Sequence, residues 1–453
     1  MRRSKKHLAV ASAAALLIVV PAGVSANAWA QSNSNSEVAS DGLALASGEP
    51  GMWVIDGISA DQAQALLVDG VDVVDVDTDT AMIIADADEA EELRAEGWDI
   101  GFHDTVYKDV PPTAAQDQYY GGYRTAAAHE ANLHNVANAN PDLAQVFDIG
   151  DSWLKTQGQG GHDIWAICLT NIQPGDCERN PDSDKPRISI ISQLHAREIS
   201  TGEISWRFID HLVAGYGSDP RVTDLLDSTE IWIVPIANPD GVDIVASGGN
   251  QPLLQRKNAN TSYGNCTGTR IGVDLNRNHN FKWGGAGTNP CGETYQGPSA
   301  GSEPETQALE SLFASIHPAQ KGPGDNDPAP ADARDVMISI HSFGEYIIHP
   351  WAWTTASAPN RTELRNLGLQ MAQSNGYLVG TAAETVGYLA PGGTDDFAYG
   401  TLGVASYTFE VGPRWGQCGG FLPAYSCMDS QLWEPNRDAL LTAAEAAAVP
   451  YQS

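Results

Sequence analysis

The segment RISIISQLHARE, residues 187–198, decides the fold of this chain. Its first seven residues contain three isoleucines on both strand faces and end before a polar stretch, which we interpret as a buried strand. Similar runs span residues 230–237, 335–340 and 404–411, and helical patterns lie between them. Buried strands that alternate with helices predict an α/β fold with a mixed, mostly parallel central sheet flanked by helices.

Two of the intervening helices have recognisable start signals. Ser200 stands three residues before Glu203, ahead of an amphipathic segment that ends near residue 216. Ser302 has the same spacing to Glu305, with a proline in the first turn, ahead of a segment that runs to about residue 316. Each pair has the form of a capping box, so we expect both serines to be N-caps.

Polar residues follow three of the predicted strands, and the carboxyl ends of parallel strands meet at one edge of a sheet. His195 and Glu198 follow the first run, His341 follows the third, and Glu410 ends the fourth. Taken singly, each has an ordinary explanation. The spacing of His195 and Glu198 is expected by chance, His341 would be a core histidine, and Glu410 would be a surface carboxylate at a strand end. Together, two histidines and one glutamate form a donor set that suits zinc and leaves a position for water. Glu410 could exchange protons with that water.

A basic cluster accompanies these donors. Asn276 and Arg277 stand side by side, and an amide next to a guanidinium can hold a carboxylate through several hydrogen bonds. Arg197 and Arg256 are further candidates in a chain that is poor in bases. For any one of these arginines, pairing with a surface carboxylate is the ordinary alternative.

The net charge limits the partners. The 453 residues contain 25 bases and 57 acids, a formal charge of −32. We therefore expect neither a nucleic acid nor an anionic membrane surface as partner, because either would need a basic face. The acids are densest over residues 31–113, which hold 19 acids and two bases. Apolar stretches within residues 51–101 predict a small α/β unit there, ended by a Pro111-Pro112 linker.

The first thirty residues have the pattern of a secretory signal. A basic start precedes the apolar run 8–20, Pro21 breaks that run, and Ala28-Trp29-Ala30 is typical of a signal-peptidase site. An uncleaved membrane anchor is the alternative, and the shortness of the run disfavours it. We expect cleavage after Ala30, secretion, and no membrane association afterwards.

Secretion favours disulfides for the six cysteines. Fifteen connectivities are possible, and short loops favour pairing between neighbours in sequence. The expected pairs are Cys168 with Cys177, Cys266 with Cys291, and Cys418 with Cys427.

Seven motifs occur in one order along the chain: HARE (195–198), NPDG (238–241), QRK (255–257), DLNRN (274–278), SIHS (339–342), GGTDDF (392–397) and TFE (408–410). On these motifs, residues 114–453 resemble the zinc carboxypeptidase family of the pancreatic carboxypeptidases A and B and the bacterial carboxypeptidase T. The resemblance implies one zinc ion bound by His195, Glu198 and His341. It also implies Glu410 as general base and acid, and Arg256 as the group that stabilises the oxyanion.

The resemblance also implies the substrate contacts. Asn276 and Arg277 would bind the terminal carboxylate of a peptide or protein, Arg197 would line the approach, and Tyr388 would close over the terminal residue. Asp274 is expected to orient a zinc-binding histidine. Asp395 matches the pocket floor, where a buried acid favours C-terminal Lys or Arg, although dual basic and apolar specificity stays open. Phe343 replaces a family tyrosine and leaves the outer subsites undefined.

The predicted organisation is a signal peptide at residues 1–30, a propeptide at 31–113 and a catalytic domain at 114–453. The family resemblance implies a monomer and a zymogen in which the propeptide covers the active site. A peptidoglycan or γ-glutamyl peptidase on the same scaffold is the alternative enzyme. A peptide-binding module without catalysis is disfavoured, because all three donors and Glu410 are present.

Overall fold

The computed structural model describes residues 45, 48–113 and 115–452. The predicted signal peptide lies outside these residues. Residues 45–453 group into one compact unit that contains two separate sheets. Within the described part of the chain, none of the helices has the length and apolar character needed to cross a membrane.

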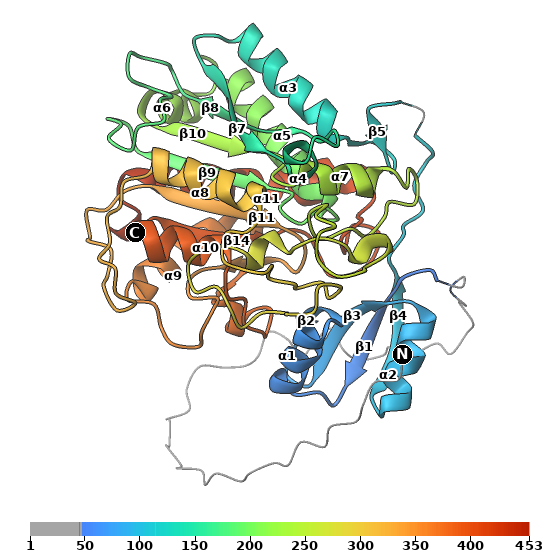
Figure 1. Cartoon of the computed structure of the whole chain (residues 1–453). Helices are drawn as coiled ribbons and strands as arrows, with labels where there is room; N and C mark the ends of the chain where they lie inside the picture. The colour runs from blue at the N-terminus through green and yellow to red at the C-terminus, as the bar shows by residue number, and fades with distance from the viewer. Residues whose placement is uncertain (1–44, 46–47, 114, 453) are drawn as a thin grey trace. The chain divides into compact units, whose positions relative to one another are not determined.

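The smaller sheet belongs to an N-terminal unit, defined here as residues 51–105. Its four strands lie in the order β2-β3-β1-β4 and pair antiparallel (Figure 1). The elements are β1 (Gly51–Asp56), α1 (Ala60–Asp69), β2 (Asp72–Val76), β3 (Thr80–Ala85), α2 (Ala87–Glu96) and β4 (Asp99–Thr105). Both helices begin with capping boxes, at Ser59 and at Asp86. The small α/β unit predicted here is confirmed.

The larger sheet has eight strands in the order β13-β12-β14-β11-β9-β10-β8-β7. Figure 1 labels β7 to β11 and β14 of this sheet. Its central strands β10, β9, β11 and β14 are parallel, while β7, β8 and β10 pair antiparallel at one side and β12 pairs antiparallel with β14 at the other. The strands are β7 (Ala144–Asp151), β8 (Asp163–Leu169), β9 (Arg187–Ser192), β10 (Glu230–Val234), β11 (Val336–His341), β12 (Tyr346–Ile348), β13 (Leu378–Gly380) and β14 (Ala405–Glu410). The predicted mixed, mostly parallel sheet is confirmed.

Helices cover both faces of this sheet, because alternate residues of each central strand belong to different hydrophobic clusters. Ile188 and Ile190 of β9 pack in one cluster, which includes residues of α5, α9 and α11. Ile191 packs in the other, which includes residues of α8. The helices are α3 (Ala126–Ala139), α4 (Trp153–Thr156), α5 (Ile199–Gly215), α6 (Pro220–Ser228), α7 (Pro239–Ala246), α8 (Pro304–Ile316), α9 (Arg361–Asn375), α10 (Thr394–Phe397) and α11 (Glu434–Glu445). A short hairpin pairs β5 (Gln118–Tyr119) with β6 (Tyr123–Arg124).

The capping box predicted at Ser200 is wrong. Helix α5 begins at Ile199, one residue earlier than Ser200, and Glu198 occupies the N-cap. The Glu203 carboxylate accepts a hydrogen bond from the backbone N–H of Arg124 instead of capping the helix. A tertiary contact has therefore replaced the local one.

The capping box predicted at Ser302 is also wrong. Helix α8 begins at Pro304 after Glu303, which makes no side-chain cap. The Glu305 carboxylate accepts a hydrogen bond from the backbone N–H of Trp153 at 2.7 Å. As in α5, the glutamate of the expected motif joins the helix to a distant segment.

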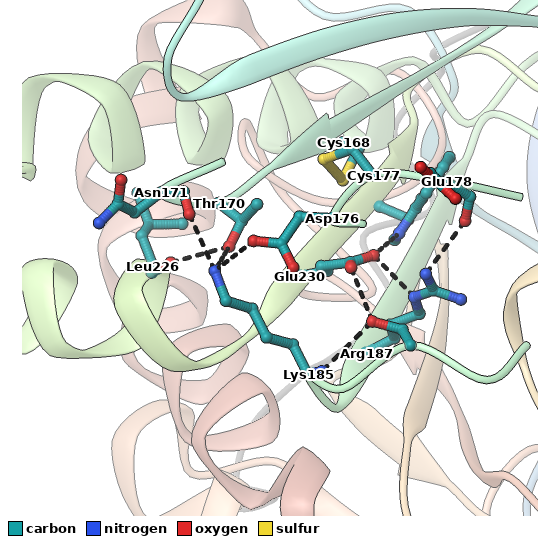
Figure 2. Close-up of a disulfide and its surroundings, with 12 residues drawn as sticks. Cys168, Thr170, Asn171, Asp176, Cys177, Glu178, Lys185, Arg187, Leu226 and Glu230 are labelled. Atoms are coloured by element: carbon teal, nitrogen blue, oxygen red, sulfur yellow. Dashed lines mark hydrogen bonds and ion pairs between the residues drawn. A yellow bond between two sulfur atoms is a disulfide. The ribbon is translucent and has the colours of Figure 1, made fainter. Parts of the chain in front are cut away.

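Three disulfides join the cysteine pairs favoured by sequence proximity, Cys168–Cys177, Cys266–Cys291 and Cys418–Cys427. The first lies near the amino end of β9, as Figure 2 shows. There the Nε of Arg187 donates to Glu230 at 2.7 Å, and both side chains are fully buried. A paired, hydrogen-bonded charge is the usual condition for such burial. These contacts anchor the end of β9 opposite to the predicted site.

Candidate active site

Three predicted donors converge at the carboxyl edge of the large sheet. His195 and Glu198 lie between β9 and α5, and His341 ends β11. Glu198 lies 2.7 Å from Nδ1 of His195 and 3.0 Å from Nδ1 of His341, and the two Nδ1 atoms are 3.1 Å apart. All three residues are buried, and one ligand atom from each lies within 4.8 Å of the others. Two nitrogens and one carboxylate therefore face a common point.

The outer nitrogen of each ring has its own partner. Asp274 Oδ1 lies 3.1 Å from Nε2 of His195, and Ser339 Oγ lies 2.8 Å from Nε2 of His341. Such contacts orient a metal-binding imidazole and leave its other nitrogen to coordinate. With two imidazole nitrogens and one carboxylate, the set fits a zinc ion that keeps one position open. Asp274 thus lies where the sequence resemblance expected it.

The electrostatics favour the protonation states that a metal requires. Burial would raise the pKa of Glu198, but the His195 and His341 rings outweigh it and lower that pKa, so the carboxylate is ionised. Burial lowers the pKa of His341, which favours the neutral imidazole.

Glu410 ends β14 and is the register partner of His341 across the β11–β14 pair. Neighbouring strands lie about 4.8 Å apart, so its carboxylate is close to the three donors. Burial, together with the Glu198 carboxylate, raises the pKa of Glu410 well above its usual value. A cation between the donors would oppose that shift. Glu410 is therefore placed to accept a proton and return it.

A cavity opens beside these groups. Eight of the predicted site residues line it: His195, Glu198, Arg256, Asn276, Arg277, Tyr388, Asp395 and Glu410. The N-terminal unit supplies another part of the wall, through Leu67 and residues 71–74. The cavity thus lies between the edge of the large sheet and the N-terminal unit.

The two arginines deep in this cavity differ in their partners. Arg256 donates to Asp274 Oδ2 from Nη2 at 3.0 Å, and its Nη1 lies 3.9 Å from Glu198. Arg277 donates only to the Asn276 carbonyl, at 2.8 Å, and forms no ion pair with any described carboxylate. Its Nε is buried without a hydrogen-bond partner among the described residues. A buried, unpaired guanidinium favours binding of an anion.

Asn276 lines the same cavity as Arg277. Its Oδ1 accepts hydrogen bonds from the backbone N–H of Thr394 at 2.9 Å and from the Thr394 hydroxyl at 3.1 Å. None of the described hydrogen bonds uses its Nδ2. Because the carbonyl side is occupied, the NH₂ group remains to donate beside Arg277.

Asp395 lies in the same cavity, in the short helix α10. It is buried, and burial raises its pKa, although the Arg277 charge opposes this. Its neighbour Asp396 instead accepts hydrogen bonds from the backbone N–H groups of Ala352 and Trp353. Of the two adjacent acids, Asp395 is therefore the one on the cavity wall.

Arg197 and Tyr388 are held by the N-terminal unit. Arg197 Nη2 donates to Asp72 Oδ1 of β2 at 2.7 Å, and the guanidinium lies 4.1 Å from the ring of Phe421. Tyr388 packs against the apolar core of the N-terminal unit, and burial raises its pKa to about 12. Val76 N donates to the carbonyl of Val386 at 3.0 Å, which ties β2 to the Tyr388 loop.

Sequence reasoning missed two groups on these strands. Ser339 stands two residues before His341 in β11, and Thr408 stands two residues before Glu410 in β14. Alternate residues of a strand share a face, so this spacing was the available signal. Thr408 lines the cavity, and Ser339 supports the His341 ring.

Known proteins with the same pattern support one family. Residues 129–438 match the family model described as zinc carboxypeptidase. The zinc carboxypeptidase of Saccharothrix mutabilis subsp. capreolus is 27% identical over 80% of this chain and 81% of its own length. Carboxypeptidase B of Canis lupus familiaris is 31% identical over 70% of this chain and 68% of its own length.

The fold agrees with this similarity. The crystal structure of carboxypeptidase A from Helicoverpa armigera superimposes with a TM-score of 0.69 at 24% identity, and the match covers 89% of this chain and 99% of that one. The fold and the donor set together define a metal-dependent peptide hydrolase. The chain belongs to the zinc carboxypeptidase family.

Proposed function

We propose that this chain is a secreted zinc metallocarboxypeptidase that removes single C-terminal residues from peptides and proteins. The observation that carries this proposal is the unpaired Arg277 beside Asn276, in the same cavity as His195, Glu198 and Glu410. An enzyme that acts on chain ends must bind a free carboxylate at a fixed distance from its reacting groups.

The proposed chemistry assigns one role to each group. Zinc held by His195, Glu198 and His341 would polarise the scissile carbonyl and lower the pKa of water. Glu410 accepts a proton from the attacking water and passes it to the departing amine. The Arg256 guanidinium donates hydrogen bonds to the carbonyl oxygen as that oxygen gains negative charge.

Recognition of the chain end rests on the other side of the cavity. Asn276 and Arg277 bind the terminal carboxylate, so cleavage releases one residue at a time. Tyr388 closes over that residue once the N-terminal unit has left. Internal peptide bonds are excluded, because their binding would leave Arg277 buried without an anion.

We further propose that the enzyme prefers basic C-terminal residues, either strictly or together with apolar ones. The support is the buried Asp395 carboxylate on the cavity wall. A lysine or arginine side chain would neutralise this acid, whereas an apolar side chain would leave it without a charge partner.

Residues 31–113 are proposed to be an inhibitory prosegment, preceded by a signal peptide at residues 1–30. The N-terminal unit contributes to the cavity wall and pairs Asp72 with Arg197, so it occupies the approach to the site. The disulfides are consistent with secretion. We propose that the active form comprises residues from the 111–118 linker onward and is a monomer.

Hydrolysis of blocked dipeptides that end in Arg, Lys, Phe or Leu, with and without a chelator, tests the function. We expect activity that the chelator abolishes and zinc restores, with Arg and Lys cleaved fastest. Activity that resists the chelator would refute the zinc mechanism, and Phe cleaved far faster than Arg would refute the role of Asp395. Hydrolysis of cell-wall peptides but not of these dipeptides would favour a peptidoglycan peptidase.

N-terminal sequencing of the active secreted protein tests the prosegment. We expect a start within residues 111–118. A fully active enzyme that starts at residue 31 would refute inhibition by the N-terminal unit.

A further inference from the structure

A second basic group lies just beyond the end of β14 and has no role in the proposed reaction. Arg414 follows β14 by four residues, and Tyr346 is the first residue of β12. Both contact Asp75 of the N-terminal unit: Arg414 Nη2 lies 3.0 Å from Oδ2, and the Tyr346 hydroxyl donates to Oδ1 at 3.4 Å. The Arg414 guanidinium also contacts the Tyr346 hydroxyl and lies 5.4 Å from its ring centre. The two side chains thus hold one carboxylate.

The strand register places Tyr346 beside the proposed catalytic glutamate at the end of β14. Tyr346 is the Cα partner of Glu410, and Ile348, two residues further along β12, lines the cavity. Tyr346 and Ile348 share a face of the strand, about 7 Å apart. In the proposed binding mode Ile348 flanks the terminal residue of the substrate, and Tyr346 then lies two residues further along β12, on the side of the residue that precedes the scissile bond.

The partner of Arg414 comes from the N-terminal unit. Within residues 48–113 and 115–452, Asp75 is the one carboxylate that forms an ion pair with Arg414. By contrast, Arg207 and Arg221 pair with acids that lie outside the N-terminal unit. Departure of the N-terminal unit would leave the Arg414 guanidinium and the Tyr346 hydroxyl without this anion. Such a group binds carboxylates through charge-assisted hydrogen bonds.

The loop that carries Arg414 is anchored. The Cys418–Cys427 disulfide closes a short loop directly after it, and Tyr346 lies in a buried strand. A charge on a restrained loop loses little conformational freedom on binding, so the site is built before a ligand arrives.

We propose that Arg414 and Tyr346 form a subsite for an acidic side chain at the penultimate residue of the substrate, which Asp75 fills while the N-terminal unit is docked. This inference rests on the proposed carboxypeptidase function. Together with Asp395, it gives the enzyme a preference for chains that end in an acidic residue followed by a basic one. Asp75 of the prosegment then occupies the same subsite as the acidic side chain of a substrate.

The test uses the full-length chain, loaded with zinc and activated by limited proteolysis within residues 111–118. Two blocked tripeptides that end in Glu-Arg and Gln-Arg differ in charge but hardly in size. We expect kcat/KM to be about fivefold higher for Glu-Arg, since a partly exposed ion pair contributes modestly. Arg414→Gln should bring the ratio of the two kcat/KM values to about one, and Arg414→Lys should keep part of it. High salt should reduce the wild-type ratio.

Arg437→Gln is the matched control, because Arg437 lies in α11 and pairs only with its neighbour Asp438. It should leave the ratio unchanged. Hydrolysis of both peptides at equal rates would overturn the subsite and leave the carboxypeptidase proposal intact. A preference for acid only at the antepenultimate position would overturn the register assigned here. Hydrolysis of neither peptide, nor of the blocked dipeptides, would overturn both proposals.

Discussion

The inner floor and the outer wall of the cavity are held in different ways. The inner floor, His195, Glu198, His341, Glu410, Asn276 and Arg277, is oriented by contacts within the catalytic part of the chain. Asp274 and Ser339 hold the two histidines, and Thr394 holds Asn276. The outer wall, Arg197, Arg414 and the Tyr388 loop, takes its ion-pair and backbone partners from β2 of the N-terminal unit.

This difference indicates how the N-terminal unit would inhibit. The donors and Glu410 already lie together while the N-terminal unit is docked. Asp72 and Asp75 of the N-terminal unit form ion pairs with Arg197 and Arg414, two arginines to which we assign substrate contacts. If the N-terminal unit inhibits by covering the site, activation requires only that this unit leaves. If it inhibited by distorting the site, activation would also require the catalytic groups to rearrange.

The largest effect is expected at the inner floor. Glu410→Gln keeps the size of the side chain but removes its capacity to carry a proton, so kcat should fall about a thousandfold or more. Zinc content should stay at one per chain, because Glu410 lies outside the three-donor set. Blocked-dipeptide kinetics and metal analysis check both. Glu345→Gln, an exposed neighbour, is the control, and an active Glu410→Gln enzyme would contradict the role of the base.

The next effect concerns the outer wall. Asp72→Asn removes the carboxylate that faces Arg197 and leaves a buried guanidinium with Glu293 at 3.8 Å. Breaking a buried pair costs about 3 kcal/mol or more, so the N-terminal unit should dissociate roughly a hundredfold more easily. The measurement is the dissociation constant of the N-terminal unit in chain nicked at the linker. Asp69→Asn, on the exposed end of α1, should change nothing. An unaltered dissociation constant would show that the Asp72–Arg197 ion pair does not hold the N-terminal unit in place.

The two regions also differ in how far the sequence could predict them. His195, Glu198, His341 and Glu410 stand at strand ends, where a local pattern and the topology rule suffice. The pairs Asp72–Arg197 and Asp75–Arg414 join two separately formed sheets, and the first spans 125 positions in sequence. No local periodicity marks such pairs. The wrong predictions of capping boxes at Ser200 and Ser302 have a related cause. Glu203 and Glu305 accept hydrogen bonds from backbone N–H groups that are distant in sequence.

A smaller effect should follow from the support of the inner floor. Asp274→Asn weakens the contact to His195 Nε2 and removes the charge paired with Arg256. Loss of such support lowers metal affinity about tenfold to a hundredfold, so we expect about thirtyfold weaker zinc binding by competition with a chelator. Asp243→Asn, which affects only the exposed His162 pair, is the control. Unchanged zinc affinity would mean that the inner floor does not depend on Asp274.

The smallest expected effect is a pH dependence of docking. Burial raises the pKa of Asp75 from 3.8 to about 6, and the Arg414 charge opposes this only in part. Asp75 of the free N-terminal unit should titrate near its ordinary value, so docking takes up a proton between these two pKa values. Docking is therefore favoured at low pH and weakens as the pH rises through 6. From pH 5 to pH 7 the dissociation constant should rise about tenfold through this group.

The nicked chain again provides the measurement, now as a function of pH. Asp75→Asn should flatten the dependence, because the amide does not titrate. Part of the slope should remain, since burial also raises the pKa of Glu293 beside Arg197. Docking that strengthens from pH 5 to pH 7 would contradict the sign of this argument. It would mean that the attraction of Arg414 exceeds the cost of burying Asp75, and hence that the outer wall binds acids more tightly than inferred here.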